Sequence, residues 1–108
     1  MIDMKNIPPS LRKRGLKKKL AKLCEENEIV YMGIFGSFIR GNQKIDSDID
    51  ILIKYKENSR KSLLDMVRLE EELSNLFGRK VDLLTIESIS PYIRDEILKS
   101  RRVIYEAE

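Results

Sequence analysis

The amino-acid sequence contains no histidine and no tryptophan, and its single cysteine is Cys24. Without histidine, the Ser-His and Cys-His catalytic pairs and zinc sites with histidine ligands are excluded. Cys24 has no second cysteine in the chain to pair with, and it falls on the apolar stripe of a predicted helix, so we interpret it as a small buried hydrophobic residue. Any chemistry must therefore rest on carboxylates, basic groups, hydroxyls and a bound metal ion.

Long hydrophobic runs are missing as well. The longest purely apolar stretches are a few residues, and the polar, basic N-terminus is not followed by the apolar segment of a secretion signal. We therefore expect a cytoplasmic protein without a membrane span. Hydrophobic residues make up 42% of the 108 residues and charged residues 36%, which is too apolar for a disordered chain. This length predicts one compact domain over residues 1–108.

Positive charge is concentrated near the N-terminus, although the formal net charge is only +3. Seven lysines and arginines fall between Arg12 and Lys22. Such a run is typical of the solvated face of a helix, and the alternative is a docking surface for nucleic acid or for an acidic partner. The run has no interleaved aromatic residues, which disfavours binding to single-stranded nucleic acid.

Hydrophobic periodicity predicts helices and strands in alternation. Helices are expected at about residues 10–26, from a cap at Asn58 and Ser59 to a stop at Gly78, and from the Ser90-Pro91 pair onward. Strands are expected at residues 28–35, from near Ser47, at 80–86, and as a short edge strand at 102–106. This order predicts an α/β or α+β fold in which helices pack on a single mixed sheet of about four strands.

Three aspartates, Asp46, Asp48 and Asp50, occupy every second position of an isoleucine-rich segment. Aspartate is depleted in strands, so this alternation works against local propensity. Side chains two apart on a strand share a face at roughly 6.5 to 7 Å, so Asp48 and Asp50 can converge on an ion while the isoleucines face the core. Oxygen ligands favour Mg²⁺ or Mn²⁺. Asp82, in a strand that can lie beside the second, is the candidate third ligand; the alternative is a solvated sheet face.

A Gly36-Ser37 turn follows the first predicted strand. Glycine at a strand end, followed by a serine, presents backbone N–H groups and a hydroxyl to an anion. Arg40, about one turn further on, can add a planar cation suited to phosphate oxygens. Because this turn stands ten residues before an Asp-x-Asp pair, it predicts a phosphate-binding turn opposite a metal site.

The segment GSFIRGNQKIDSDIDIL resembles the signature of the polymerase-β-type nucleotidyltransferases, and in particular their minimal, antitoxin-like branch. The resemblance covers nearly the whole chain and implies the polymerase-β-like fold. It implies that Gly36 and Ser37 hold the phosphates of the nucleotide and that Asp48 and Asp50 bind two Mg²⁺ ions. Asp82 would then complete the metal site and help to activate the attacking hydroxyl.

Four positions in or beside the matched segment bear further on this resemblance. Arg40 and Gly41 match the Arg-Gly pair that follows the turn in the family, whereas Ile39 stands where the family more often has alanine. Asp46 precedes the matched Asp-x-Asp pair, so we expect it to be a loop or rim residue.

The resemblance also implies a reaction. An acceptor hydroxyl would attack the α-phosphate of ATP, and the minimal branch transfers AMP to a tyrosine of a helical HEPN-type ribonuclease toxin, which is thereby silenced. One alternative is a catalytically silent antitoxin that acts by binding alone. The other is an RNA-binding module that uses the basic first helix, for which affinity should fall steeply with salt.

Overall fold

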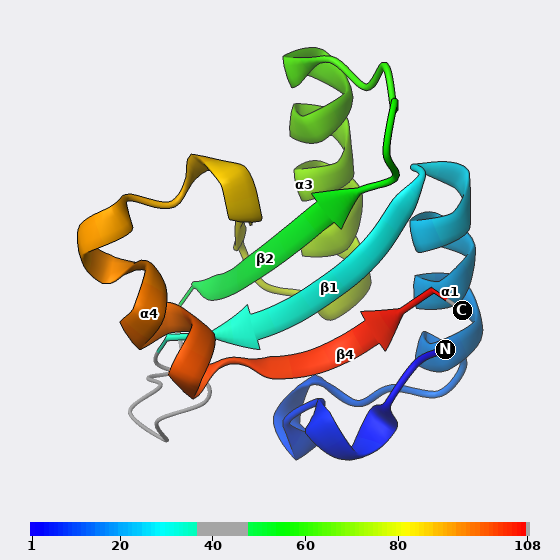
Figure 1. The fold of residues 1–108 in the computed structure, drawn as a ribbon. Helices are drawn as coiled ribbons and strands as arrows, with labels where there is room; N and C mark the ends of the chain where they lie inside the picture. The colour runs from blue at the N-terminus through cyan, green and yellow to red at the C-terminus, as the bar shows by residue number, and fades with distance from the viewer. Residues whose placement is uncertain (37–47, 108) are drawn as a thin grey trace.

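Four strands form one mixed sheet in the computed structural model, which describes residues 1–36 and 48–107 (Figure 1). They are β1 (Ile29–Phe35), β2 (Ile49–Tyr55), β3 (Val81–Thr85) and β4 (Arg102–Glu106). The strand order is β3-β2-β1-β4, with β1 antiparallel to both β2 and β4, and β2 parallel to β3. The predicted mixed sheet is confirmed, and β4 lies at its edge as expected.

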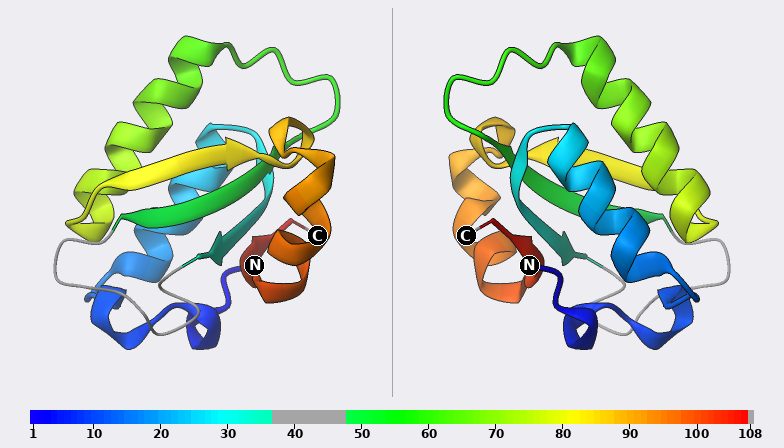
Figure 2. Two further views of the ribbon diagram at one scale, coloured as in Figure 1. Left: turned by 90° about the vertical axis from the view of Figure 1, so that its left-hand side faces the viewer. Right: turned by 90° about the vertical axis from the view of Figure 1, so that its right-hand side faces the viewer.

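Helices pack on both faces of this sheet. In the described part of the chain they are α1 (Leu16–Glu26), α3 (Leu63–Phe77) and α4 (Pro91–Ser100), with 3-10 turns η1 (Met4–Asn6), η2 (Pro9–Leu11) and η3 (Ile86–Ser88). Helices α1 and α3 cover one face, and α4 lies against part of the other (Figure 2). This arrangement of helices on a single mixed sheet is the predicted fold class.

The alternation of side chains along β2 divides the core into two parts. Ile49, Ile51 and Ile53 are fully buried in the larger cluster, together with apolar side chains of α1 and α3. Leu52 faces the other way and is buried with Phe35 in a smaller cluster beside α4. The isoleucines therefore hold the sheet to its helices, as their spacing predicted.

The first helix begins later than predicted, at Leu16 instead of near Ser10. Pro9 and Ser10 belong to the short 3-10 turn η2. Gly15 directly precedes α1 and has a φ of 78°. A residue in this left-handed conformation cannot continue a right-handed helix. The helical spacing of the leucines was therefore correct, whereas the proline cap belonged to a separate turn.

The second predicted helix also begins later, at Leu63. Its N-cap is Ser62, whose hydroxyl accepts a hydrogen bond from the Asp65 N–H while the Asp65 carboxylate accepts one from the Ser62 N–H. This reciprocal capping box satisfies backbone donors that the first turn leaves open. Asn58 instead adopts a φ of 66° in the preceding loop, and Ser59 donates its hydroxyl to Glu28.

Two predicted helix ends are confirmed. Gly78, with a φ of 71°, follows the last residue of α3. Ser90 caps α4 by accepting a hydrogen bond from the Tyr92 N–H, and Pro91 is the first residue of that helix. Both positions follow the usual asymmetry of proline at helix starts and glycine just beyond helix ends.

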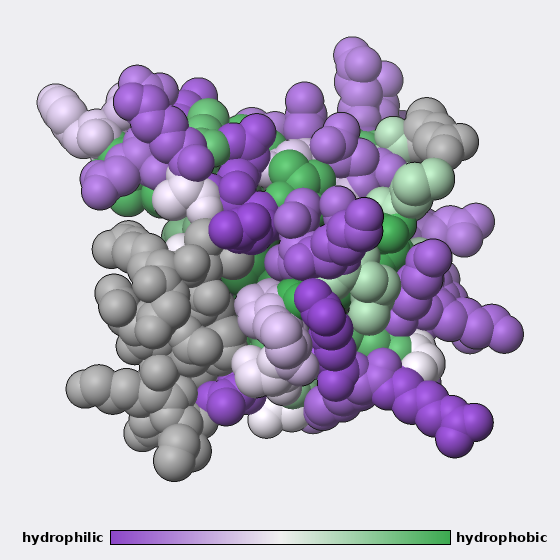
Figure 3. All heavy atoms as spheres, turned by 90° about the horizontal axis from the view of Figure 1, so that it is seen from below, coloured by the Kyte–Doolittle hydropathy of each residue, from purple (hydrophilic) through white to green (hydrophobic). Residues whose placement is uncertain are grey.

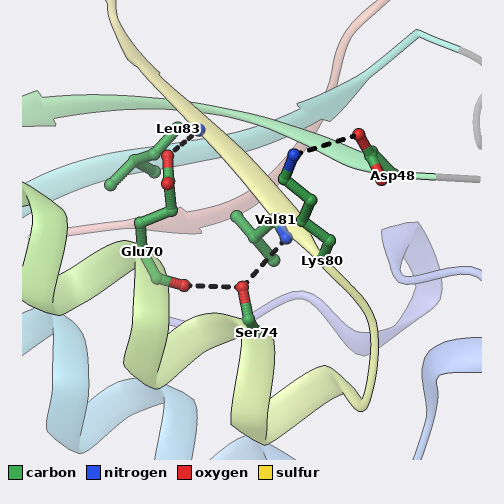
Figure 4. A network of polar contacts seen from close by, with 6 residues as sticks. All are labelled: Asp48, Glu70, Ser74, Lys80, Val81 and Leu83. Atoms are coloured by element: carbon green, nitrogen blue, oxygen red, sulfur yellow. Dashed lines mark hydrogen bonds and ion pairs between the residues drawn. The ribbon is translucent and has the colours of Figure 1, made fainter.

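Strand β3 is an edge strand, and α3 covers its outer side (Figure 4). The Ser74 hydroxyl accepts a hydrogen bond from the Val81 N–H at 2.9 Å, and Glu70 Oε2 accepts one from the Leu83 N–H at 3.0 Å. Outward-facing N–H groups of an edge strand would otherwise invite pairing with another chain. These two bonds also fix the backbone on either side of Asp82.

The N-terminal segment closes the opposite edge of the sheet. Ile2 forms a bridge with Tyr105 of β4, and the Asp3 N–H donates to the Ile104 carbonyl.

Cys24 is fully buried, and this burial raises the pKa of its thiol to about 12, which fits its interpretation as a hydrophobic residue. Within the described ranges, no helix has both the length and the apolar character needed to cross a membrane.

Candidate active site

The structure places two of the three predicted acids side by side. Asp50 on β2 and Asp82 on β3 are register partners in the parallel pair, and Asp48 comes directly before β2. Partners on neighbouring strands lie about 4.8 Å apart and point to the same face. That face is the one opposite Ile49 and Ile51, because side chains alternate along β2.

Asp48 and Asp82 interact with each other and with Lys80. The Lys80 ammonium lies 4.0 Å from Asp48 Oδ2 (Figure 4). The pKa of Asp82 is raised above its ordinary value by partial burial and then by the negative charge of Asp48 and a side-chain hydrogen bond with it, while Lys80 opposes the rise. Negative charge is thus crowded at the start of β2 and β3, as expected where like charges share a site.

Gly36, the residue that follows β1, is required by this arrangement. Its φ of +79° is left-handed, and a Cβ atom at this position would overlap with Asp50 Oδ2 and lie 3.2 Å from Asp50 Cγ. Any other residue would therefore be strained and would displace the Asp50 carboxylate. The sequence predicted a turn here, but the contact with Asp50 depends on the antiparallel pairing of Phe35 with Asp50.

The other predicted phosphate-binding residues, Ser37 and Arg40, lie outside the described residues. The same holds for Ile39, Gly41 and Asp46. Of the predicted site, the structure describes Gly36 and the three acids Asp48, Asp50 and Asp82.

The donor atoms of these acids fit a hard divalent cation. All are carboxylate oxygens, and a cation between them would relieve the crowding of Asp48 and Asp82. Within residues 1–36 and 48–107, however, no group of three or more histidine, cysteine or acidic side chains is close enough to hold a metal ion. The three acids therefore meet as neighbouring pairs, Asp50 with Asp82 and Asp48 with Asp82, and not as a preformed cluster of three.

Lys80 is a residue of this site that no sequence pattern indicated. Its carbonyl accepts a hydrogen bond from the Ile49 N–H at 2.9 Å, which fixes Lys80 opposite the start of β2. Its side chain then reaches Asp48, while its exposed fraction of 71% leaves the ammonium in contact with solvent. The only indication in the sequence was its position directly before the strand that carries Asp82.

Comparison with known proteins identifies the class. The family model for polymerase beta nucleotidyltransferases matches residues 18–108. A candidate protein adenylyltransferase of Methanocaldococcus jannaschii is 45% identical over 83 residues, covering 77% of this chain and 87% of the relative. The protein adenylyltransferase MntA of Thermococcus cleftensis is 42% identical over 89 residues, covering 82% of this chain and 83% of the relative. The chain therefore belongs to the polymerase beta nucleotidyltransferase family, and it is an enzyme of that class.

Solved structures with this fold include toxin–antitoxin complexes. A toxin–antitoxin crystal structure with AMP-PNP superposes with a TM-score of 0.69 at 22% identity, covering 85% of this chain and 74% of the other. The complex of a tri-AMPylated HEPN toxin with its MNT antitoxin from Shewanella oneidensis gives a TM-score of 0.62 at 19% identity, covering 87% and 72%. A structure described as a minimal nucleotidyltransferase gives 0.68 at 31% identity, covering 82% and 89%.

Proposed function

We propose that this protein transfers AMP from ATP to a tyrosine hydroxyl of a HEPN-type toxin and so acts as its antitoxin. The pairing of Asp50 with Asp82, with Asp48 beside them, is the observation that carries the proposal. The acceptor class is supported by the relatives named as protein adenylyltransferases and by the AMPylated HEPN toxin in a complex of the same fold.

In this proposal all three acids bind metal, and Asp82 also takes part in proton transfer. Asp48 and Asp50, together with Asp82, would hold two Mg²⁺ ions, and Gly36, Ser37 and Arg40 would hold the phosphates. Bound magnesium supplies charge neutralisation at the phosphate oxygens. A carboxylate oxygen of Asp82 accepts the proton of the acceptor hydroxyl.

The bonds that change follow from these roles. The acceptor oxygen forms a bond to the α-phosphorus of ATP, the bond from that phosphorus to the bridging oxygen breaks, and pyrophosphate leaves with the bonding electrons. The product is a phosphodiester between AMP and the acceptor side chain. Since no histidine is available in the chain, proton transfer rests on a carboxylate.

The test uses the purified chain, Mg²⁺ and the product of the neighbouring gene as the candidate HEPN-type partner. ATP labelled at the α-phosphate should label the partner, ATP labelled at the γ-phosphate should not, and Asp50→Asn should abolish the labelling. Label from the γ-position would indicate phosphoryl transfer and contradict adenylyl transfer. An unlabelled partner would refute the proposed reaction.

A catalytically silent antitoxin is the second candidate, because the described acids do not form a preformed cluster of three. In that case the Asp50→Asn variant would inhibit the ribonuclease activity of the partner as well as the wild type does. In the enzymatic case, inhibition would require ATP and an intact Asp50.

A further inference from the structure

An apolar groove of about 800 Å³ lies between the N-terminal segment and α1. Its apolar lining comes from Met1, Ile2, Met4, Leu16 and Ala21. Ile2 and Leu16 also belong to the main core, so the floor of the groove is the outer side of the core itself. Met1 is 75% exposed at its margin. Methionine side chains adapt to varied apolar surfaces, so this lining suits a macromolecular partner.

The charged residues that line this groove all carry positive charge. They are the exposed lysines Lys13, Lys17 and Lys18, and none of the lining residues that the structure describes is acidic. Seen from below, hydrophilic side chains project around smaller hydrophobic areas of the surface (Figure 3). Charge complementarity therefore calls for a partner that carries carboxylates or phosphates beside an apolar anchor.

The apolar lining favours a protein partner with carboxylates over a nucleic acid with phosphates. Nucleic acids present phosphates and flat bases, and proteins that bind single strands without sequence preference use aromatic side chains for stacking. Among residues 1–36 and 48–107, none of those that line the groove is aromatic. An amphipathic helix with an apolar stripe and flanking Asp or Glu residues matches both the apolar floor and the lysines.

We propose that this groove docks an acidic, amphipathic helix of the partner protein that accepts AMP. The inference rests on the proposed function for the identity of the partner. It concerns a surface separate from the acids, because the N-terminal segment pairs with β4, whereas Asp82 lies on β3 at the other edge of the sheet. Docking and transfer are therefore separable by substitution.

A pair of double variants of α1 tests the groove. Lys17→Glu with Lys18→Glu reverses two lysines of the groove. Lys19→Glu with Lys22→Glu makes the same charge change on the same helix, but these lysines line a different depression, between α1 and α3, which also contains Glu26 and Glu72. Thermal melts show whether both variants are folded, and a third variant, Ala21→Gln, alters the apolar lining without changing charge.

The measurement is the dissociation constant for the candidate HEPN-type partner, the product of the neighbouring gene, with AMP transfer at saturating partner as a second readout. The groove variant should bind roughly 10- to 100-fold more weakly, whereas the Lys19 and Lys22 variant should bind within about threefold of the wild type. Transfer at saturation should be unchanged in both, and Ala21→Gln should also weaken binding.

Equal losses in the two charge variants would overturn the proposal, since only net charge would then matter. Unchanged partner binding in the groove variant would overturn it too, and a selective loss of RNA binding there would assign the groove to nucleic acid. If the wild type binds the partner but transfers no AMP, the proposed function fails, while the ratio of binding constants still decides the role of the groove.

Discussion

Asp50 and Ile51 are adjacent in β2 and lie on opposite faces of the sheet. Ile51 is fully buried beneath α1 and α3, whereas Asp50 is partly exposed and is paired with Asp82. At its start, β2 thus contributes to the main core with its isoleucines and to the candidate site with Asp50, while Leu52 further along the face of Asp50 is buried in the smaller cluster. Because Asp50 and Ile51 lie on opposite faces, substitutions of these two residues should have separable effects on AMP transfer and on stability.

Besides the loss of labelling expected for Asp50→Asn, the largest effect is expected from Asp82→Asn on the same face of the sheet. The variant should lower AMP transfer by roughly 100- to 1,000-fold, as removal of a principal electrostatic group of an active site does. In the absence of magnesium it should melt no lower than the wild type, because burial and the charge of Asp48 already disfavour the Asp82 carboxylate. Calorimetry with and without magnesium and ATP measures both states.

With magnesium and ATP the order of melting temperatures should reverse, because ligands that bind only the folded state stabilise it in proportion to their affinity. Asp95→Asn is the control, since Asp95 is an exposed acid on α4. If Asp82→Asn and Asp95→Asn responded alike to magnesium and ATP, the acids would be a solvated sheet face and the metal site would be refuted.

Ile51→Ala tests the opposite face of β2, where the expected effect is on stability and not on AMP transfer. Loss of this fully buried side chain should lower the free energy of unfolding by about 2 to 5 kcal/mol. AMP transfer per folded molecule should stay near the wild-type value at low temperature. Urea unfolding gives the stability, with Lys54→Ala as the control because Lys54 is exposed on the same strand. A loss of transfer in fully folded Ile51→Ala would show that the two faces are coupled.

Gly36→Ala should affect both properties at once. A left-handed backbone costs a non-glycine residue roughly 1 to 2 kcal/mol, and the added Cβ would displace the Asp50 carboxylate. We therefore expect lower stability together with reduced transfer, measured by thermal melts and by labelling of the partner. Gly15→Ala is the control, because Gly15 also has a positive φ but a Cβ there would meet nothing within 4 Å. Equal losses of transfer in both variants would remove the special role of Gly36.

The strands were predictable because alternation with a period of two is a local property of the sequence. Ile49, Ile51 and Ile53 in alternation with Asp48 and Asp50 sufficed to predict which side chains face the core. The parallel pairing of β2 with β3 brings Asp82 to Asp50. The sequence showed only that such a pairing was possible, because the two residues are 32 positions apart. The roles of the three acids remain predictions.

The starts of the helices and the surroundings of the acids were less predictable. Ser59 and Ser62 are both suitable N-cap residues, and the choice of Ser62 depends on Asp65 at the third helical position and on the hydrogen bond that Ser59 makes with Glu28. Lys80 approaches Asp48 only because β3 lies beside β2. Such contacts join residues that are far apart in the sequence, so no local sequence pattern predicts them.

The smallest expected effect concerns the polar link between α3 and the strand of Asp82. Glu70→Ala removes the acceptor of the Leu83 N–H and should lower the free energy of unfolding by about 1 kcal/mol. Glu70→Gln keeps an acceptor oxygen and should stay near the wild type, as should Glu71→Ala at the exposed neighbouring position. Hydrogen exchange of the Leu83 amide should accelerate in Glu70→Ala alone, and AMP transfer should fall with it if this bond positions Asp82. Equal losses of stability in the Ala and Gln variants would mean that the charge of Glu70, and not its hydrogen bond, holds α3 to β3.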